Sequence, residues 1–304
     1  MHKVCWLGLG RMGLPMAAHL SAVGFDVHGY DPSVSVREAA TRAGITMHST
    51  AQEAGDGAHA VFTMLPTYAH VEQALSAPGF LRATADAALI IDSSTISGAN
   101  ARELSVLAAT AGRRFLDAPV SGGTPGAHAG TLTFMVGGPE ESVQEAAPYF
   151  SAMGSRTFHI GEVGCGQSAK TVNNMLLAMN MAAVCEAAAL AEKLGLDHHA
   201  LVDIVKVSSG DSWVLRNFYP VAGVVENAPA NRDFAPGFTA HLMRKDVGLA
   251  LEAAAPHTVD LSMTEEAARR LDRLINAGSG DLDFSALIQV AQGRNLETVK
   301  GGVA

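Results

Sequence analysis

Short apolar runs and segments with helical spacing alternate over the first 160 residues of the chain. The residues between the first two runs place Met12, Met16 and Leu20 at helical spacing, and Gly24 is a usual helix stop, so a helix is predicted over 11–24. Strands that alternate with helices predict a parallel sheet covered on both faces. The predicted strands are residues 3–9, 25–30, 58–65 and 87–92, with weaker candidates at 114–118 and 131–136.

The pattern changes after about residue 163. Residues 168–194 form a stretch of 27 residues, rich in Ala and Met, without Gly or Pro. As a helix it would be about 40 Å long, and it is so apolar that we expect burial on most sides, shared with a partner subunit. Strand signals are scarce beyond it, which predicts an α/β domain over 1–163 and an all-helical domain over 164–304, joined by the long helix. Further helices are predicted at 199–207, 242–255, 263–277 and 284–292.

Composition narrows the class of protein. The chain has 304 residues, 48% of them hydrophobic and 17% charged, which is enough for two folded domains. Its formal charge of −9 disfavours a nucleic-acid partner, because such proteins normally present a basic face.

Several features favour a soluble cytoplasmic protein. The cysteines Cys5, Cys165 and Cys185 cannot all pair and match no zinc motif, so reduced thiols and no metal site are expected. Residues 4–7 already have the pattern of a strand, which argues against a secretory signal. The longest apolar stretch, 175–190, is interrupted by Asn180 and Glu186, so no membrane span is expected.

The first predicted strand leads into a glycine loop of the form G-x-G-x-x-G. The context is that of a dinucleotide site, with the loop after a strand and at the start of a helix. The first glycine permits a tight turn, the second lets a pyrophosphate approach the backbone, and the third lets helix and strand pack closely. The free N–H groups of the helix start would then face the phosphates. The loop is Gly8-Leu9-Gly10-Arg11-Met12-Gly13.

Asp31 follows the second predicted strand, 21 residues after Gly10. A carboxylate there can accept hydrogen bonds from the adenosine ribose. A 2′-phosphate would meet like charge, and residues 32–36 contain no Arg or Lys to offset it. The predicted cofactor is therefore NAD rather than NADP. A glycine turn followed by an ordinary Asp-Pro-Ser turn is the structural alternative.

Three further segments carry candidate chemistry. Ser121-Gly122-Gly123 ends a stretch whose backbone N–H groups could hold a carboxylate, or it is a flexible turn. Lys170 and Asn174 share one face near the start of the long helix, and desolvation would lower the pKa of such a lysine toward the range that proton transfer requires. The alternative is a solvated lysine at a frayed helix end. Lys245-Asp246 starts a helical stretch and could equally be a surface ion pair.

Four ordered motifs resemble the β-hydroxyacid dehydrogenase family. They are Gly8–Ala17, Asp117–Gly123 continuing to Leu132, the pair Lys170 and Asn174, and Lys245-Asp246. Residues 208–213, 219–224 and 236–238 and the helix segment 170–177 are most similar to the 3-hydroxyisobutyrate dehydrogenases of that family. The resemblance extends from the first strand to at least Ala250, and so covers most of the chain.

The resemblance implies NAD-dependent oxidation of a small 3-hydroxy acid, with 3-hydroxyisobutyrate giving methylmalonate semialdehyde in valine breakdown. Ser121, Gly122 and Gly123 would hold the substrate carboxylate, Lys170 would take the hydroxyl proton, and Asn174 would orient the substrate or Lys170. Lys245 would add positive charge beside substrate and cofactor, with Asp246 as its neighbour. A homodimer or homotetramer is expected. The implied cofactor contacts are Gly8, Leu9, Gly10, Arg11, Met12, Gly13, Asp31, Leu65, Pro66, Ser94, Thr95, Lys245 and Asp246.

The sequence allows two other hypotheses. Related acids such as L-serine, D-glycerate, tartronate semialdehyde or 3-hydroxypropionate would need only a small change of pocket, because one methylene contributes about 1–3 kcal/mol to discrimination. A non-catalytic NAD-binding sensor would keep Gly8, Gly10, Gly13 and Asp31 but would have no need of Lys170 and Asn174.

Overall fold

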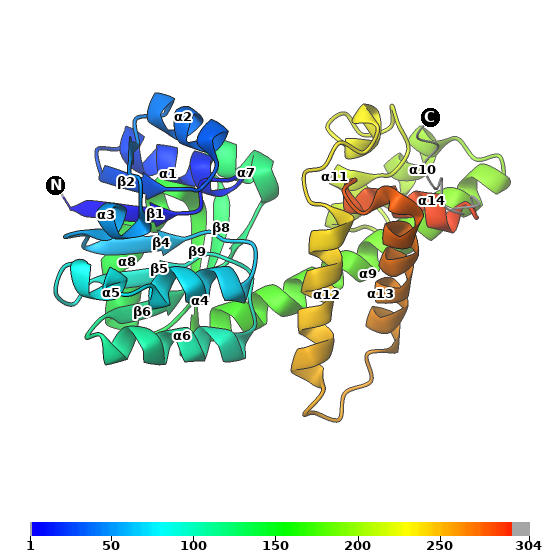
Figure 1. Cartoon of the computed structure of the whole chain (residues 1–304). Coiled ribbons are helices and arrows are strands. Elements are labelled where there is room, and N and C mark those ends of the chain that lie inside the picture. The colour runs from blue at the N-terminus through cyan, green and yellow to red at the C-terminus, as the bar shows by residue number, and fades with distance from the viewer. Residues whose placement is uncertain (1, 294–304) are drawn as a thin grey trace, which may run out of the picture. The chain divides into compact units, whose positions relative to one another are not determined.

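The computed structural model describes residues 2–293 and divides into two compact units (Figure 1). The α/β unit runs from Met1 to Lys170 and the helical unit from Thr171 to Ala304. The last part of the predicted second domain, 294–304, lies outside the described residues.

A single sheet of nine strands forms the centre of the α/β unit. Its strands lie in the order β3-β2-β1-β4-β5-β6-β8-β7, and β9 pairs with β8. The first six are parallel in the order 3-2-1-4-5-6, which is the doubly wound dinucleotide-binding arrangement and confirms the predicted fold class. The strands are β1 (Lys3–Leu7), β2 (Asp26–Tyr30), β3 (Thr46–Met47), β4 (Ala60–Thr63), β5 (Leu89–Asp92), β6 (Arg114–Asp117), β7 (Val120–Ser121), β8 (Leu132–Gly137) and β9 (Gly154–Gly161).

The last three strands depart from the expected parallel sheet. β8 runs antiparallel to β6 and β7, and β9 runs parallel to β8. β6 and β7 follow each other closely and pair with the same strand, and the chain reverses only after Ser121, in the short segment that contains α7 (Gly123–Ala129).

Side chains on each central strand alternate between two hydrophobic cores, as a sheet covered on both faces requires. On β1, Val4 and Trp6 belong to one core, while Cys5 and Leu7 belong to the other. Figure 1 shows helices on both sides of this sheet. The helices of this unit are α1 (Gly13–Ala22), α2 (Val34–Arg42), α3 (Ala51–Gly55), α4 (Tyr68–Ser76), α5 (Phe80–Ala83), α6 (Gly98–Thr110), α7 (Gly123–Ala129) and α8 (Glu140–Met153).

The carboxyl ends of four parallel strands lie level with one another. The register pairs Leu7 with Thr63, Thr63 with Asp92, and Asp92 with Asp117. Thr63 Oγ1 donates to Asp92 Oδ1 over 2.7 Å, so polar side chains replace apolar ones at this edge. Ligands of open α/β sheets bind outside the carboxyl ends of the strands, and the loops that leave this row carry most of the predicted cofactor contacts.

The helical unit is built around the long helix α9 (Cys165–Lys193), which begins inside the α/β unit. α12 and α13 pack side by side, and their core includes Met243 and Leu271 together with Met181 of α9. The predicted helix over 284–292 is a 3₁₀ turn followed by one short α-helix. The elements after α9 are α10 (His198–Val205), α11 (Trp213–Phe218), η1 (Pro229–Arg232), α12 (Ala240–Ala254), α13 (Ser262–Leu274), η2 (Ile275–Ser279), η3 (Phe284–Leu287) and α14 (Ile288–Ala291).

Helix α9 has the length and composition of a membrane span. It nonetheless contributes to the core of the helical unit, because Ala178, Met181 and Cys185 belong to the hydrophobic cluster there. Buried core helices of soluble proteins meet the same criterion of length and composition.

Candidate active site

The glycine loop between β1 and α1 has the shape that a bound pyrophosphate needs. A Cβ at Gly13 would overlap the carbonyl oxygen of Gly8, so only glycine lets α1 approach the loop this closely. A Cβ at Gly10, in contrast, would meet nothing within 4 Å. The backbone at Gly10 is therefore open to a ligand, whereas the helix behind it is closely packed.

Asp31 holds this loop from the end of β2. Its carboxylate is 9% exposed and accepts the backbone N–H of Leu9 (2.9 Å, Oδ2) and of Ser33 (2.9 Å, Oδ1). The predicted ribose acceptor is thus also a brace for the glycine loop. A carboxylate oxygen can accept two hydrogen bonds, so these contacts leave acceptor capacity for a ligand.

The loops after β4 and β5 are hydrogen-bonded to each other. The N–H of Leu65 donates to Ser94 Oγ over 2.9 Å, and the N–H of Ser94 donates to Asp92 Oδ1 over 3.1 Å. The Leu65-Pro66 and Ser94-Thr95 segments, both predicted cofactor contacts, therefore meet at the same edge of the sheet as the glycine loop. NAD fits this edge, because open backbone at Gly10 and an acceptor at Asp31 follow neighbouring strands.

Ser121 ends the short strand β7, and Gly122 and Gly123 follow it into α7. The backbone at Gly122 has φ +134° and a Cβ there would lie 3.0 Å from Leu132, so a side chain would be strained and crowded. The segment is thus an ordered turn fixed by its glycines, consistent with a preformed cradle for an anion.

Lys170 lies in the second turn of α9 and is only 8% exposed. It is the last residue of the α/β unit, so the helix start that carries it belongs to the same body as the cofactor edge of the sheet. A buried lysine is costly in free energy unless it serves a purpose, and the alternative of a solvated lysine at a frayed helix end does not apply.

Asn174 lies one turn after Lys170 and is 2% exposed. Its side-chain Nδ2 donates to Asp246 Oδ2 over 2.5 Å, and its Oδ1 accepts from Asn173 over 3.0 Å. Asp246 Oδ1 in turn lies 3.1 Å from Lys245 Nζ. The Lys-Asp motif is therefore a buried carboxylate on α12 that joins Asn174 to Lys245, and not a pair confined to the surface.

Comparison with known proteins identifies this arrangement. Residues 3–161 match the family described as the NAD binding domain of 6-phosphogluconate dehydrogenase, and residues 164–291 match that described as NAD-binding of NADP-dependent 3-hydroxyisobutyrate dehydrogenase. A probable 3-hydroxyisobutyrate dehydrogenase of Mycobacterium tuberculosis is 43% identical over 97% of this chain and 99% of its own. The chain belongs to the β-hydroxyacid dehydrogenase family.

Two further relatives show the range of this family. An NAD-dependent L-serine dehydrogenase of Pseudomonas aeruginosa is 43% identical over 94% of this chain and 97% of its own. A solved structure of the 3-hydroxyisobutyrate dehydrogenase of Mycobacterium tuberculosis with L-serine has a TM-score of 0.88 and 43% identity, and the match covers 95% of this chain and 99% of that one. This β-hydroxyacid dehydrogenase is an NAD-dependent oxidoreductase, as the sequence predicted.

Sequence reasoning assigned no role to two buried polar residues of this dehydrogenase, Asp117, named only as part of a motif, and Gln167. Asp117, level with Asp92 at the end of β6, accepts the N–H of Gly164 over 2.7 Å and of Gln167 over 2.8 Å. Burial raises the pKa of Asp117 to about 6, although these hydrogen bonds oppose the shift. Gln167 is fully buried at the start of α9, yet its side chain is polar. The sequence signal that could have found this contact is a glutamine directly after the glycine-rich turn 161–166, at the start of a long apolar stretch.

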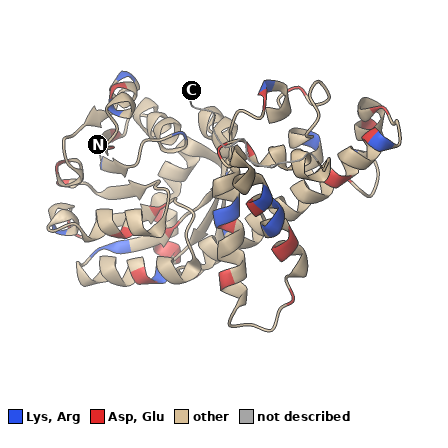
Figure 2. Cartoon of the chain, turned by 45° about the vertical axis from the view of Figure 1, so that its right-hand side comes forward, with Lys and Arg blue, Asp and Glu red and all other residues tan. Residues whose placement is uncertain are grey.

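Other candidate features lie apart from these residues. The helical unit contains a cavity of about 220 Å³, lined by residues that include Pro220, Val221, Phe234 and Ile288. Among the described residues that line it, none is a predicted site residue. Between residues 2 and 293 there is no group of three or more His, Cys, Asp or Glu residues placed to hold a metal ion. Acidic and basic residues alternate along the ribbon of the helical unit (Figure 2), and on α12 and α13 Arg244 forms an ion pair with Asp272 at 2.8 Å.

Proposed function

We propose that this dehydrogenase oxidises 3-hydroxyisobutyrate to methylmalonate semialdehyde with NAD. The observation that carries the proposal is the pair on α9, in which a buried lysine lies one turn before an asparagine whose amide is fixed by Asp246. A nucleotide-sensing protein would have no reason to bury such a pair, since burial of charged and amide groups costs free energy unless they are used.

The chemistry requires one proton and one hydride to leave the substrate. Lys170, as a neutral amine, accepts the proton of the substrate hydroxyl while the C–O bond becomes a carbonyl. Bound NAD would supply the hydride acceptor for the same carbon, and the glycine loop and Asp31 would hold it. Asn174 presents its amide one turn away, where it orients the hydroxyl or the Lys170 amine. No other acid or base is needed for the proton and electron balance.

The remaining predicted residues hold the two ligands. Ser121, with the backbone of Gly122 and Gly123, binds the substrate carboxylate through hydrogen-bond donors. Lys245 adds positive charge for substrate or cofactor, and Asp246 limits that charge through its ion pair. The cofactor contacts are those assigned above: Gly8, Leu9, Gly10, Arg11, Met12, Gly13, Asp31, Leu65, Pro66, Ser94, Thr95, Lys245 and Asp246.

L-serine is the competing substrate. A relative at 43% identity is named for it, and another at 43% was solved with it. L-serine and 3-hydroxyisobutyrate share a carboxylate and a primary hydroxyl on the 3-carbon, and differ in an ammonium in place of a methyl group. A pocket with no carboxylate to pair the ammonium would favour the methyl group, since an unpaired buried ammonium is costly.

NADH formation tests the proposal. Absorbance is followed with NAD or NADP and 3-hydroxyisobutyrate, L-serine, D-glycerate or 3-hydroxypropionate. The highest kcat/KM is expected for 3-hydroxyisobutyrate with NAD. A higher value for L-serine would reassign the substrate within the family. Binding of NAD without turnover of any acid would instead make the protein a sensor or an enzyme of another substrate class.

The setting of the enzyme is part of the same proposal. We place it in the cytoplasm, in valine breakdown, as a homodimer or homotetramer. Val172, Leu176 and Leu190 of α9 are 49–59% exposed, and such apolar side chains on one helix support burial by a second copy. Light scattering coupled to gel filtration decides this, because a monomer at micromolar concentration would contradict it.

A further inference from the structure

The start of helix α9 is hydrogen-bonded to the chain at the ends of two different strands, β6 and β5. Asp117, at the end of β6, accepts the N–H groups of Gly164 and Gln167 at 2.7 and 2.8 Å. These are orphan donors of the first helical turn, which otherwise need a cap. Because the cap comes from β6 and not from the preceding turn, the position of α9 depends on the sheet rather than on the local chain.

Gln167 makes a second attachment from the helix to the sheet. Its Nε2 donates to the carbonyl oxygen of Ser94 over 2.7 Å, and its Oε1 accepts the N–H of Ile96 over 3.2 Å. Ser94 is itself tied to Leu65 through its hydroxyl. The first turn of α9 is therefore bonded to the loop after β5, in which Ser94 and Thr95 are assigned to the cofactor.

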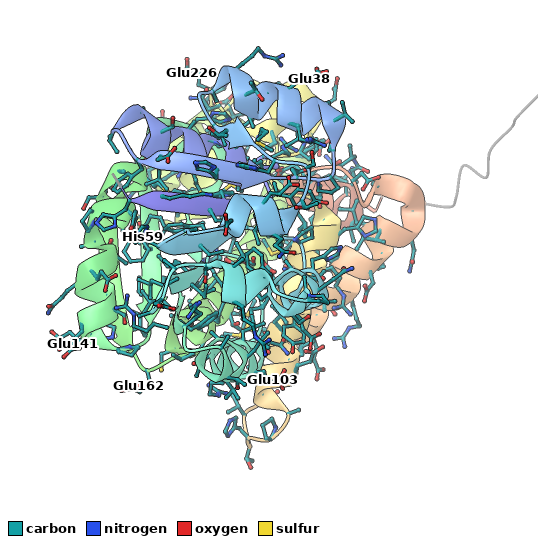
Figure 3. All side chains as sticks on the ribbon, turned by 60° about the vertical axis from the view of Figure 1, so that its left-hand side comes forward. Glu38, His59, Glu103, Glu141, Glu162 and Glu226 are labelled. Carbon is teal, nitrogen blue, oxygen red and sulfur yellow. The ribbon has the colours of Figure 1, made fainter. Side chains whose placement is uncertain are left out.

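Glycines make this close approach possible. A Cβ at Gly166 would meet the carbonyl of Met135, and one at Gly137 would lie 2.5 Å from Asp117 Oδ1. A Cβ at Gly164 would lie 2.6 Å from the carbonyl oxygen of Gly98, at the start of α6. The glycine-rich turn between β9 and α9, where Figure 3 labels Glu162, thus serves packing of the helix against the sheet. We call Asp117, Gln167 and these glycines the α9 clasp.

We propose that Asp117 and Gln167 are positioning residues for Lys170, which the clasp fixes relative to the cofactor loop at Ser94-Thr95. Lys170 lies one helical turn after Gln167, on the same face of α9. One member of the clasp, Asp117, also lies four residues before Ser121, the predicted carboxylate ligand. A displacement of the reacting group by about 1 Å can lower a rate on the order of 100-fold, so this attachment acts on the chemical step.

This inference rests on the proposed function, in which Lys170 takes the hydroxyl proton. Its test uses the full-length enzyme and two variants, Asp117→Asn and Gln167→Met. Asp117→Asn places an amide donor against one of the two N–H groups, and Gln167→Met removes both side-chain hydrogen bonds at nearly constant volume. The matched control is Asp197→Asn, which alters a carboxylate that caps α10 by accepting the N–H of Ala200 over 2.8 Å.

Three measurements are made on each protein: kcat and KM, the dissociation constant of NAD, and hydrogen exchange of the amides of residues 164–170. We expect a kcat about 10- to 100-fold lower for Gln167→Met, with KM and the NAD constant within about threefold of wild type. Hydrogen exchange at 164–170 is expected to be faster in Gln167→Met than in wild type. The control Asp197→Asn should change neither kcat nor the exchange at 164–170. Asp117→Asn should behave like Gln167→Met; if it does not fold, Gln167→Met alone decides.

An unchanged kcat in Gln167→Met would overturn the positioning role, and so would parallel losses of kcat and NAD affinity. If wild-type enzyme turns over none of the acids, the proposed function fails by itself. The exchange measurement still decides the clasp in that case, because unchanged exchange at 164–170 in Gln167→Met would show that the contact does not hold the helix.

Discussion

Asn174 and Asp246 are 72 residues apart in the chain, yet their side chains form a hydrogen bond of 2.5 Å inside the helical unit. The amide of asparagine has a donor end and an acceptor end, and a carboxylate accepts only. Asp246 therefore decides which end of Asn174 faces it. The orientation of the amide one turn from Lys170 is set by α12.

Replacement of Asp246 tests that orientation. Asp246→Leu leaves Asn174 Nδ2 without this acceptor and Lys245 without this carboxylate, so we expect a kcat at least about 10-fold lower and a loss of stability on the order of 1–3 kcal/mol. Asp246→Asn can rotate its amide to keep an acceptor toward Asn174, and should retain more activity. Equal kcat values for both variants would contradict the role of the hydrogen bond. Steady-state kinetics and urea unfolding measure the two effects.

Lys170→Met tests the proton acceptor. Methionine keeps the length and apolar stem of lysine without its amine, so the fold should be retained at this 8% exposed position. Turnover should fall by a factor of at least about 1000, since general acid–base groups contribute roughly 100- to 10,000-fold. NAD binding, measured by calorimetry, should stay within about twofold. Turnover close to wild type would remove Lys170 from the mechanism.

Gly10 and Gly13 form a matched pair for the cofactor loop. Gly10→Ala adds a methyl group where nothing lies within 4 Å, so the fold should persist while NAD affinity falls, because the methyl group occupies the space left for the pyrophosphate. Gly13→Ala forces a Cβ onto the Gly8 carbonyl and should lower the free energy of unfolding by several kcal/mol, on the order expected for overpacking. Thermal unfolding and NAD titration separate the two outcomes. Intact NAD affinity in Gly10→Ala would place the pyrophosphate elsewhere.

Asp31 has two roles that one substitution can separate. Asp31→Asn keeps an acceptor for one of the N–H groups of Leu9 and Ser33 but removes the negative charge. We expect the ratio of kcat/KM for NAD over NADP to fall by at least about 10-fold, because the repulsion of a 2′-phosphate is gone. Asp31→Ala should weaken both cofactors further, since the loop loses its brace. A ratio unchanged in Asp31→Asn would exclude charge at Asp31 as the basis of the preference.

Asp117 should make stability depend on pH. Its pKa is about 6 in the folded protein, above the ordinary value of 3.8, so the folded state holds this proton more tightly than the unfolded state does. The stabilising contribution is thus full below about pH 4 and is lost as pH rises through 6, with a size on the order of 2–3 kcal/mol. The difference in unfolding free energy between wild type and Asp117→Asn should fall over this range and be flat above pH 7. A difference that rises with pH would contradict this prediction, because it would mean that folding lowers the pKa of Asp117.

The parts of the fold that were predictable are those in which side chains repeat with a regular period. Strand β1 is a short apolar run because it is buried on both faces, and α9 is a long apolar stretch without Gly or Pro from 168 onward, which is typical of a helix. Strand β9 was missed because its side chains are exposed along most of its length, so it has no apolar alternation. Its position follows from pairing with β8, a tertiary property.

The candidate site divides in the same way. The glycine loop and the pair Lys170 and Asn174 have local spacing that the sequence displays. The hydrogen bond between Asp117 and Gln167 joins residues 50 positions apart. It depends on how α9 packs against the end of β6, so no local sequence pattern predicts it. Lys245-Asp246 was visible as a motif, but its partner Asn174 was not, because the packing of α12 against α9 decides it.

Helix α9 crosses the border between the two units, which falls between Lys170 and Thr171 without a break in the helix. A gene fusion that exchanged whole units between relatives at this border would take the lysine from one parent and the asparagine from the other. A junction at residue 163 instead would keep the pair together but would separate Asp117 from the helix start that it caps. Recombinants with either junction therefore need parents whose residues match at these contacts.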